Sequence, residues 1–94
     1  MKYSELKKIK YIFNENIKYR DLGDMLMAYN TDNGDTYEFN EIGGEIFKFL
    51  IAGIEFNDII QKLLSEYNVQ ESDIKEDIEE IFNRMIELKI IIIK

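Results

Sequence analysis

The stretch NGDTYEFNEIGGEIFKFLIAG, residues 33–53, decides the fold of this chain. Asn33-Gly34 is typical of a type I′ hairpin turn, because both central residues of that turn need a positive φ. Residues 36–39 are then predicted to form a short strand, and Asn40 directly after it is a good N-cap for an apolar helix. Gly53 suits the position just past the end of that helix. The stretch therefore places one strand directly against the start of a set of helices.

Two more strands are predicted upstream of this stretch. Residues 17–20 alternate apolar and basic side chains, as in a strand with one wet face, and residues 21–24 are typical turn residues. Residues 25–29 are apolar on both faces, which favours a central strand. We therefore expect a three-stranded antiparallel meander with residues 36–39 at its edge.

Two further helices are predicted downstream. From Phe56 to about Asn68, apolar residues recur at the spacing of one helix face. A third helix starts between Gln70 and Ser72 and runs to about Leu88. The fold class is thus α+β: a winged helix-turn-helix-like domain in which a three-stranded antiparallel N-terminal sheet is followed by three helices.

The two ends of the chain are less regular. Residues 1–13 space apolar side chains at about a helical period, which indicates either a basic amphipathic helix at a membrane surface or a frayed or lightly docked arm. We expect the arm, and assign residues 1–14 as a basic N-terminal arm and residues 15–94 as a single domain. The run Ile90–Ile93 is expected to pack as a short strand, against a second copy in a homodimer, or against an enzyme that the chain scaffolds.

Composition bounds the chemistry that the chain can perform. The 94 residues include no Cys and no His, which removes disulfides, thiolate metal sites and the commonest general base. No apolar run approaches the ~20 residues that span a bilayer. We therefore expect a cytoplasmic protein that is not an enzyme, binds no metal or cofactor and has no membrane partner.

The net charge of −7 is unevenly distributed. Residues 1–20 hold six basic and two acidic residues, whereas residues 71–88 hold seven acids and two bases. An acidic body repels phosphate backbones, because affinity for nucleic acid rests on Lys and Arg. A winged-helix DNA-binding transcriptional regulator is the rival function, but its third helix would have to read the DNA. The acidic third helix argues against a nucleic-acid partner.

Binding through backbone and shape is what these residues allow. A strand at the edge of a sheet presents unpaired N–H and C=O groups, to which an extended peptide can add as a further strand. Residues 36–39 form such an edge. If the third helix packs beside this strand, apolar side chains would floor a trough between the two, and acids would line its rim.

The order of these elements and several of their residues resemble the PqqD family. The resemblance covers about residues 15–92, and the Phe-Asn junction at the end of the third strand carries most of its weight. The matching residues are Tyr37-Glu38-Phe39-Asn40, then Ile46, Leu50 and Gly53, then Ile59, Leu63, Tyr67 and Val69, then Asp77, Ile78, Phe82, Leu88 and Ile90.

Members of that family are recognition elements for ribosomally synthesised and post-translationally modified peptides. The resemblance implies that the leader of an unmodified precursor peptide adds to residues 36–39 and lies against the third helix. It also implies a separate modifying enzyme, often a radical S-adenosylmethionine protein, to which the precursor is delivered. By position, the contacts would come from Thr36, Tyr37, Glu38 and Phe39 on the strand and from Asp77, Ile78, Ile81 and Arg84 on the helix.

Overall fold

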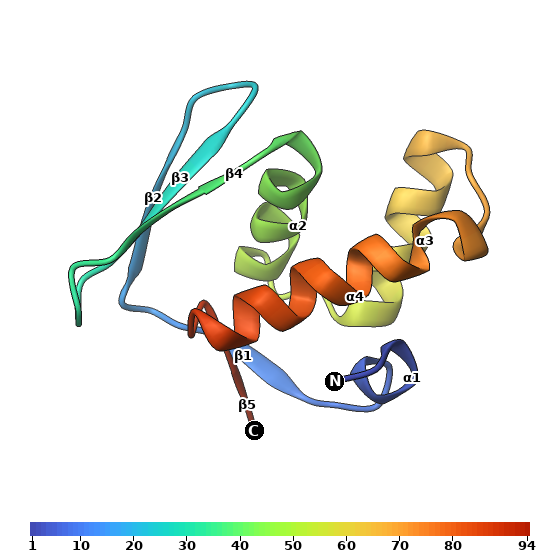
Figure 1. Cartoon of the computed structure of the whole chain (residues 1–94), viewed down its shortest axis with the longest axis horizontal. Helices are drawn as coiled ribbons and strands as arrows, with labels where there is room; N and C mark the ends of the chain where they lie inside the picture. The colour runs from blue at the N-terminus through green and yellow to red at the C-terminus, as the bar shows by residue number, and fades with distance from the viewer.

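The computed structural model describes residues 1–94, which form two small sheets and four helices (Figure 1). The first half of the chain contains α1 (Tyr3–Leu6), β1 (Tyr11–Phe13), β2 (Ile17–Asp21), β3 (Leu26–Asn30) and β4 (Thr36–Phe39). The second half contains α2 (Glu41–Ile51), α3 (Phe56–Tyr67), α4 (Glu71–Glu87) and β5 (Ile91–Ile93). The predicted α+β order, a three-stranded meander followed by three helices, is confirmed. None of the helices combines the length and apolar character that crossing a bilayer requires.

The larger sheet has the strand order β2-β3-β4, and both strand pairs are antiparallel. Leu26 and Ala28 of β3 are buried on the inner face, which packs on the helices. The prediction that residues 25–29 form the central strand is confirmed, but only one face of β3 is covered: Tyr29 is 45% exposed on the outer face, where no helix packs (Figure 1). β4 lies at the edge of the sheet, as predicted.

The connection between β3 and β4 is longer than the predicted type I′ turn. Gly34 has a φ of 78°, but Asn33 is not among the residues with positive φ. The Gly34 N–H donates to the Asn30 carbonyl at 2.8 Å, and the Asn30 N–H donates to the Asp35 carbonyl at 2.9 Å. The turn prediction is therefore wrong, because a single left-handed residue within a longer loop reverses the chain here.

The helix α2 begins directly where β4 ends. The Asn40 side chain caps it, its Oδ1 accepting from the Gly43 N–H at 2.9 Å, and Gly53 follows the helix with a φ of 79°. Both ends lie where the sequence predicts them. Inside the helix, a Cβ on Gly44 would lie 3.2 Å from the Leu26 Cβ of β3. The absence of a side chain at this glycine therefore lets α2 lie close to the sheet.

Aromatic side chains join α2 to both sheets. The Phe47 ring lies at the centre, with ring centroids 5.3 Å from Phe13, 5.4 Å from Tyr19 and 5.8 Å from Phe39. Aromatic pairs at such separations add about 0.5–1.5 kcal/mol each beyond the area they bury. Through Phe47 and Phe39, the position of β4 is therefore fixed by the core.

The N-terminal segment is packed into the core rather than frayed. Tyr3 is 3% exposed and Leu6 is 0% exposed. The Tyr3 ring packs edge-on against Phe56 of α3 at 5.3 Å. The lightly docked arm expected for residues 1–13 is thus wrong, because Tyr3 and Leu6 find apolar neighbours that lie far along the chain. The boundary at residue 14 stays a prediction.

A second, two-stranded sheet joins the ends of the chain. β1 pairs antiparallel with β5, so that Tyr11 lies opposite Ile93 and Phe13 lies opposite Ile91. The short strand predicted within Ile90–Ile93 is therefore confirmed. Ile91 is buried, whereas Ile92 is 44% exposed.

Candidate peptide-binding site

The outer edge of β4 presents main-chain groups to solvent. In an antiparallel pair, residues that lie opposite one another alternate between hydrogen-bonded and non-hydrogen-bonded pairs. The Asn30 N–H donates to the Asp35 carbonyl, so the pair two residues further along, which includes Tyr37, is also hydrogen-bonded. The N–H and C=O groups of Thr36 and Glu38 therefore point away from β3, toward the open edge.

The hydrogen bonds on the other side of β3 confirm this phase. The Thr31 N–H donates to the Asn16 carbonyl at 3.0 Å, and the Leu22 N–H donates to the Met25 carbonyl at 2.9 Å. Counting inward from these two bonds along the register, the alternate residues of β3 bond to β2. Ala28 therefore bonds to β4, which agrees with the hydrogen-bonded pair of Ala28 and Tyr37 inferred from the bond between Asn30 and Asp35.

The side chains of β4 divide between the two faces of the sheet. Phe39 is 7% exposed and belongs to the core, Tyr37 is half-buried, and Thr36 and Glu38 are exposed. Burial and the neighbouring Asp35 carboxylate, which accepts from the Tyr37 hydroxyl at 3.3 Å, raise the pKa of Tyr37. Three of the four predicted contact residues on this strand are thus accessible, and Phe39 supports the strand from below.

One flank of α4 is covered by the N-terminal segment. The Asn83 side-chain amide donates to the Met1 carbonyl at 2.7 Å. The Tyr3 N–H donates to Glu79 Oε2 at 3.1 Å, and the Lys75 ammonium lies 5.5 Å from the centroid of the Tyr3 ring. These contacts occupy the side of the helix that carries Lys75, Glu79 and Asn83.

The opposite flank of α4 is open. Asp77, Ile81 and Arg84 follow one another at helical spacings of four and three, which aligns them on one stripe. Asp77 and Arg84 are exposed and Ile81 is half-buried, and the three ion pairs of the structure lie elsewhere. Ile78 is 2% exposed and belongs to the core. Three of the four predicted contact residues on this helix are therefore accessible.

Two residues that the sequence analysis does not assign to the site also lie on this flank. Ile74 and Leu88 stand seven positions before and after Ile81, and both are half-buried against the core. Seven residues make nearly two helical turns, so the three side chains lie along one line. The spacing of seven around Ile81 is the signal that could have identified them.

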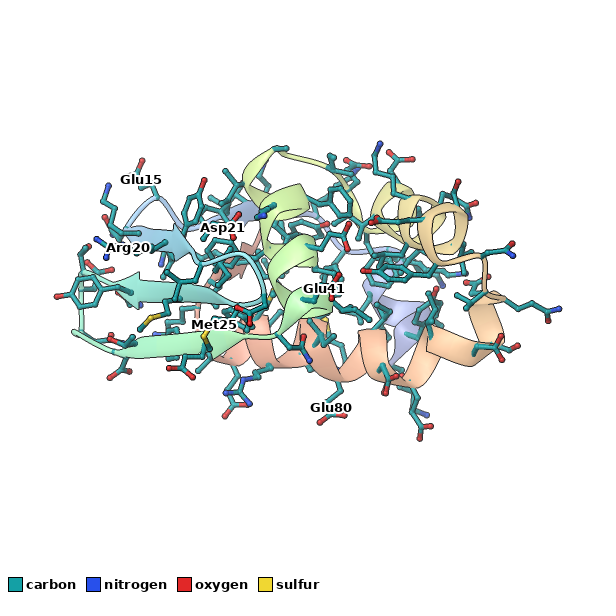
Figure 2. The ribbon with its side chains drawn as sticks, turned by 90° about the horizontal axis from the view of Figure 1, so that it is seen from above. Glu15, Arg20, Asp21, Met25, Glu41 and Glu80 are labelled. Atoms are coloured by element: carbon teal, nitrogen blue, oxygen red, sulfur yellow. The ribbon has the colours of Figure 1, made fainter.

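The structure brings β4 and the open flank of α4 to the same side of the molecule. In Figure 1, α4 passes in front of α2, and β4 runs above the C-terminal end of α4 into α2. Figure 2, seen from above, places both segments along the lower edge of the view, where Glu80 points outward. The two predicted halves of the site are thus on one side, with α2 behind them.

A second polar region lies where the turn between β2 and β3 meets α2, around Asp21, Met25 and Glu41, which Figure 2 labels. A hollow of about 360 Å³ there includes Glu45 and Glu66 in its lining. The Glu45 carboxylate accepts from the Tyr67 hydroxyl at 2.7 Å, which raises the pKa of Tyr67 to about 12, and its proximity raises the pKa of Glu66. No group of three or more His, Cys, Asp or Glu residues in the structure is placed to hold a metal ion.

An antiparallel meander with a free edge strand, followed directly by three helices, defines a winged helix-like α+β domain. The model of the family described as Coenzyme PQQ synthesis protein D (PqqD) matches residues 25–91. The chain therefore belongs to the PqqD family, as the resemblance predicted. No curated protein sequence matches the chain.

Two solved structures share the fold. TbiB1 in complex with the TbiA(beta) leader peptide has a TM-score of 0.78 at 14% sequence identity, covering 85% of this chain and 93% of TbiB1. Lasso peptide synthetase B1 complexed with the leader peptide has a TM-score of 0.73 at 21% identity, covering 87% of this chain and 96% of the synthetase subunit. At these identities, the likeness establishes a common fold.

Proposed function

We propose that this chain binds the leader segment of a ribosomally synthesised precursor peptide and catalyses no reaction itself. The observation that carries the proposal is the free edge of β4, where Thr36 and Glu38 direct their main-chain groups outward. A leader in extended conformation would add there as a fourth strand of the larger sheet. Membership of the PqqD family supports this role, as do two leader-peptide complexes of the same fold.

The predicted contact residues would then act in three ways. Thr36 and Glu38 would pair with the leader through their main chains. The side chains of Tyr37, Asp77, Ile81 and Arg84 would face it from the strand and the helix. Phe39 and Ile78, both buried, would hold these two elements in place without touching the peptide.

The bound precursor would be presented to a separate modifying enzyme, for which a radical S-adenosylmethionine protein is one candidate. A chain without Cys or His lacks a thiolate nucleophile and the commonest general base. Its contribution would be to hold the leader and so raise the local concentration of the core segment at the enzyme. The cytoplasmic location stays a prediction, as does a homodimer.

The rival role in DNA binding gains no support. The element that would have to read the major groove is α4, in which acidic residues far outnumber basic ones. Phosphate backbones would be repelled by such a helix.

A titration followed by amide chemical shifts tests the proposal. The protein, labelled with ¹⁵N, is titrated with the TbiA(beta) leader peptide and with peptides encoded by short reading frames beside the gene of this chain. We call these peptides the leader panel. At least one should shift the amides of β4 and of the open flank of α4, and leave the exposed face of α3 unchanged. Shifts confined to other surfaces, or none with any peptide, would overturn the proposal.

A further inference from the structure

We propose that the segment recognised at β4 is an alternating one, with apolar side chains on its inner face and Lys or Arg on its outer face and flanks. This inference rests on the proposed function, since it assumes that the peptide adds as a strand to β4. It goes further because it assigns a sequence class to the ligand. Three features of the structure support it: the apolar surface below the inner side of the peptide, the carboxylate beside its outer side, and the acidic rim of α4.

The inner side of the added strand would meet apolar surface. Successive side chains of a strand point to opposite faces, so every second residue of the peptide would share the face of Tyr37. Tyr37 is half-buried, as are Ile74, Ile81 and Leu88 on the open flank of α4, and all four pack against the core. Covering them with apolar side chains would complete their burial. The inward positions are therefore apolar.

The outer side of the added strand would meet an unpaired carboxylate. Arg20, Met27 and Glu38 lie in one line across β2, β3 and β4. Glu38 makes no ion pair with Arg20, because one strand lies between them, and the ion pairs of the structure use other residues. A Lys or Arg on the added strand beside Glu38 would form an opposite-charge cross-strand pair.

The exposed rim of α4 has the same sign. Asp77 and Glu80 are exposed carboxylates without an ion pair, against one guanidinium, that of Arg84. In Figure 2, Glu80 points away from the body of the protein on the same side as β4. The whole chain carries a net charge of −7. A basic peptide would therefore associate with this side of the protein faster, and dissociate from it more slowly, than an acidic peptide.

Selection from a random peptide library tests this assignment without knowledge of the natural ligand. The immobilised protein is used to enrich a display library of random peptides of about twelve residues, long enough to cover a four-residue edge strand with flanks on both sides. We expect enrichment of apolar residues at alternate positions and of Lys and Arg between and beside them. The same selection is repeated with Glu38→Lys and, as a control for charge alone, with Glu66→Lys on α3.

The Glu38→Lys variant should lose much of the enrichment of basic residues, whereas Glu66→Lys should retain it. Enriched peptides of neutral or acidic character, or equal effects of the two variants, would overturn the inference. The proposed function has a separate readout, which is whether the enriched peptides or the leader panel shift the amides of β4. If peptides bind at β4 without the charge pattern, only the sequence class is wrong. If nothing binds at β4, both proposals fall.

Discussion

The hydroxyl of Tyr3 donates a hydrogen bond to Glu71 Oε1 at 2.7 Å, across 68 positions of sequence. This contact fixes the N-terminal segment to the first turn of α4, on the side that Glu79 and Asn83 continue. Asp77, Ile81 and Arg84 lie on the opposite flank of the helix, which these contacts leave uncovered. If α4 binds a peptide as we propose, the N-terminal segment therefore limits that peptide to the flank of Asp77, Ile81 and Arg84.

Tyr3→Ala should destabilise the protein by about 3 kcal/mol, because it removes a buried aromatic ring from the core. The measurement is the urea midpoint followed by circular dichroism. Ile12→Ala is the control, since Ile12 lies in the same segment but is 46% exposed; its cost should stay below about 1 kcal/mol. Equal small losses for both variants would restore the view of residues 1–14 as an arm outside the domain.

Stability should depend on the ionisation of Glu71. The Tyr3 hydroxyl and the Lys7 ammonium lower the pKa of Glu71 from its ordinary value of 4.5. A carboxyl group whose pKa is lowered on folding stabilises the protein above the unfolded-state pKa, and this contribution is lost as the pH falls through the folded-state pKa. The stability difference between wild type and Glu71→Gln should therefore be present at neutral pH and shrink steadily below 4.5. Urea midpoints that differ by the same amount at neutral and strongly acidic pH would contradict this.

Glu38→Pro should weaken binding of a leader peptide by about tenfold or more, because proline removes an N–H that points to the open edge. Glu38→Gln retains that N–H and removes only the charge, so its effect should be about threefold. Affinities by fluorescence anisotropy provide the comparison, with amide spectra to confirm that each variant is folded. Wild-type affinity for the proline variant would remove strand addition from the mechanism. Tyr37→Pro is a poorer test, because the Tyr37 N–H already bonds within the sheet.

The two flanks of α4 should separate binding from stability. Ile81→Ala on the open flank should weaken leader binding about fivefold or more, because the inner face of the peptide loses its apolar neighbour. Asn83→Ala on the covered flank should lower the urea midpoint and leave the affinity unchanged. If Asn83→Ala impairs binding and Ile81→Ala does not, the peptide binds the flank that carries Asn83, and the proposed site on α4 is wrong.

The parts of the fold that depend on neighbouring residues are predictable from the sequence. The strand at 36–39, the cap at Asn40 and the end of α2 at Gly53 each rest on local backbone chemistry, and all three are confirmed. The prediction of a type I′ turn is wrong, and the reason is also a local contact. The Asn33 side chain accepts from the Asp35 N–H at 2.9 Å, which favours a different loop conformation from the one that the pair Asn33-Gly34 usually adopts.

The parts that depend on distant contacts are not predictable in this way. Tyr3 is buried by helices that begin more than 50 residues later. The spacing of apolar residues within 1–13 does not indicate these contacts. For the candidate site, the sequence predicts the edge strand and its partner helix. It does not predict which amides of β4 face outward, because that depends on the phase set by the bond between Asn30 and Asp35.

Hydrogen exchange at the amides of β4 tests the central claim most directly. In the free protein, Thr36 and Glu38 should exchange rapidly, and Tyr37 and Phe39 should be protected by their bonds to β3. When a peptide of the leader panel is bound to saturation, the amides of Thr36 and Glu38 should become protected, since they would then donate to the added strand. Unchanged rapid exchange at both amides in the saturated complex would contradict binding by strand addition to β4.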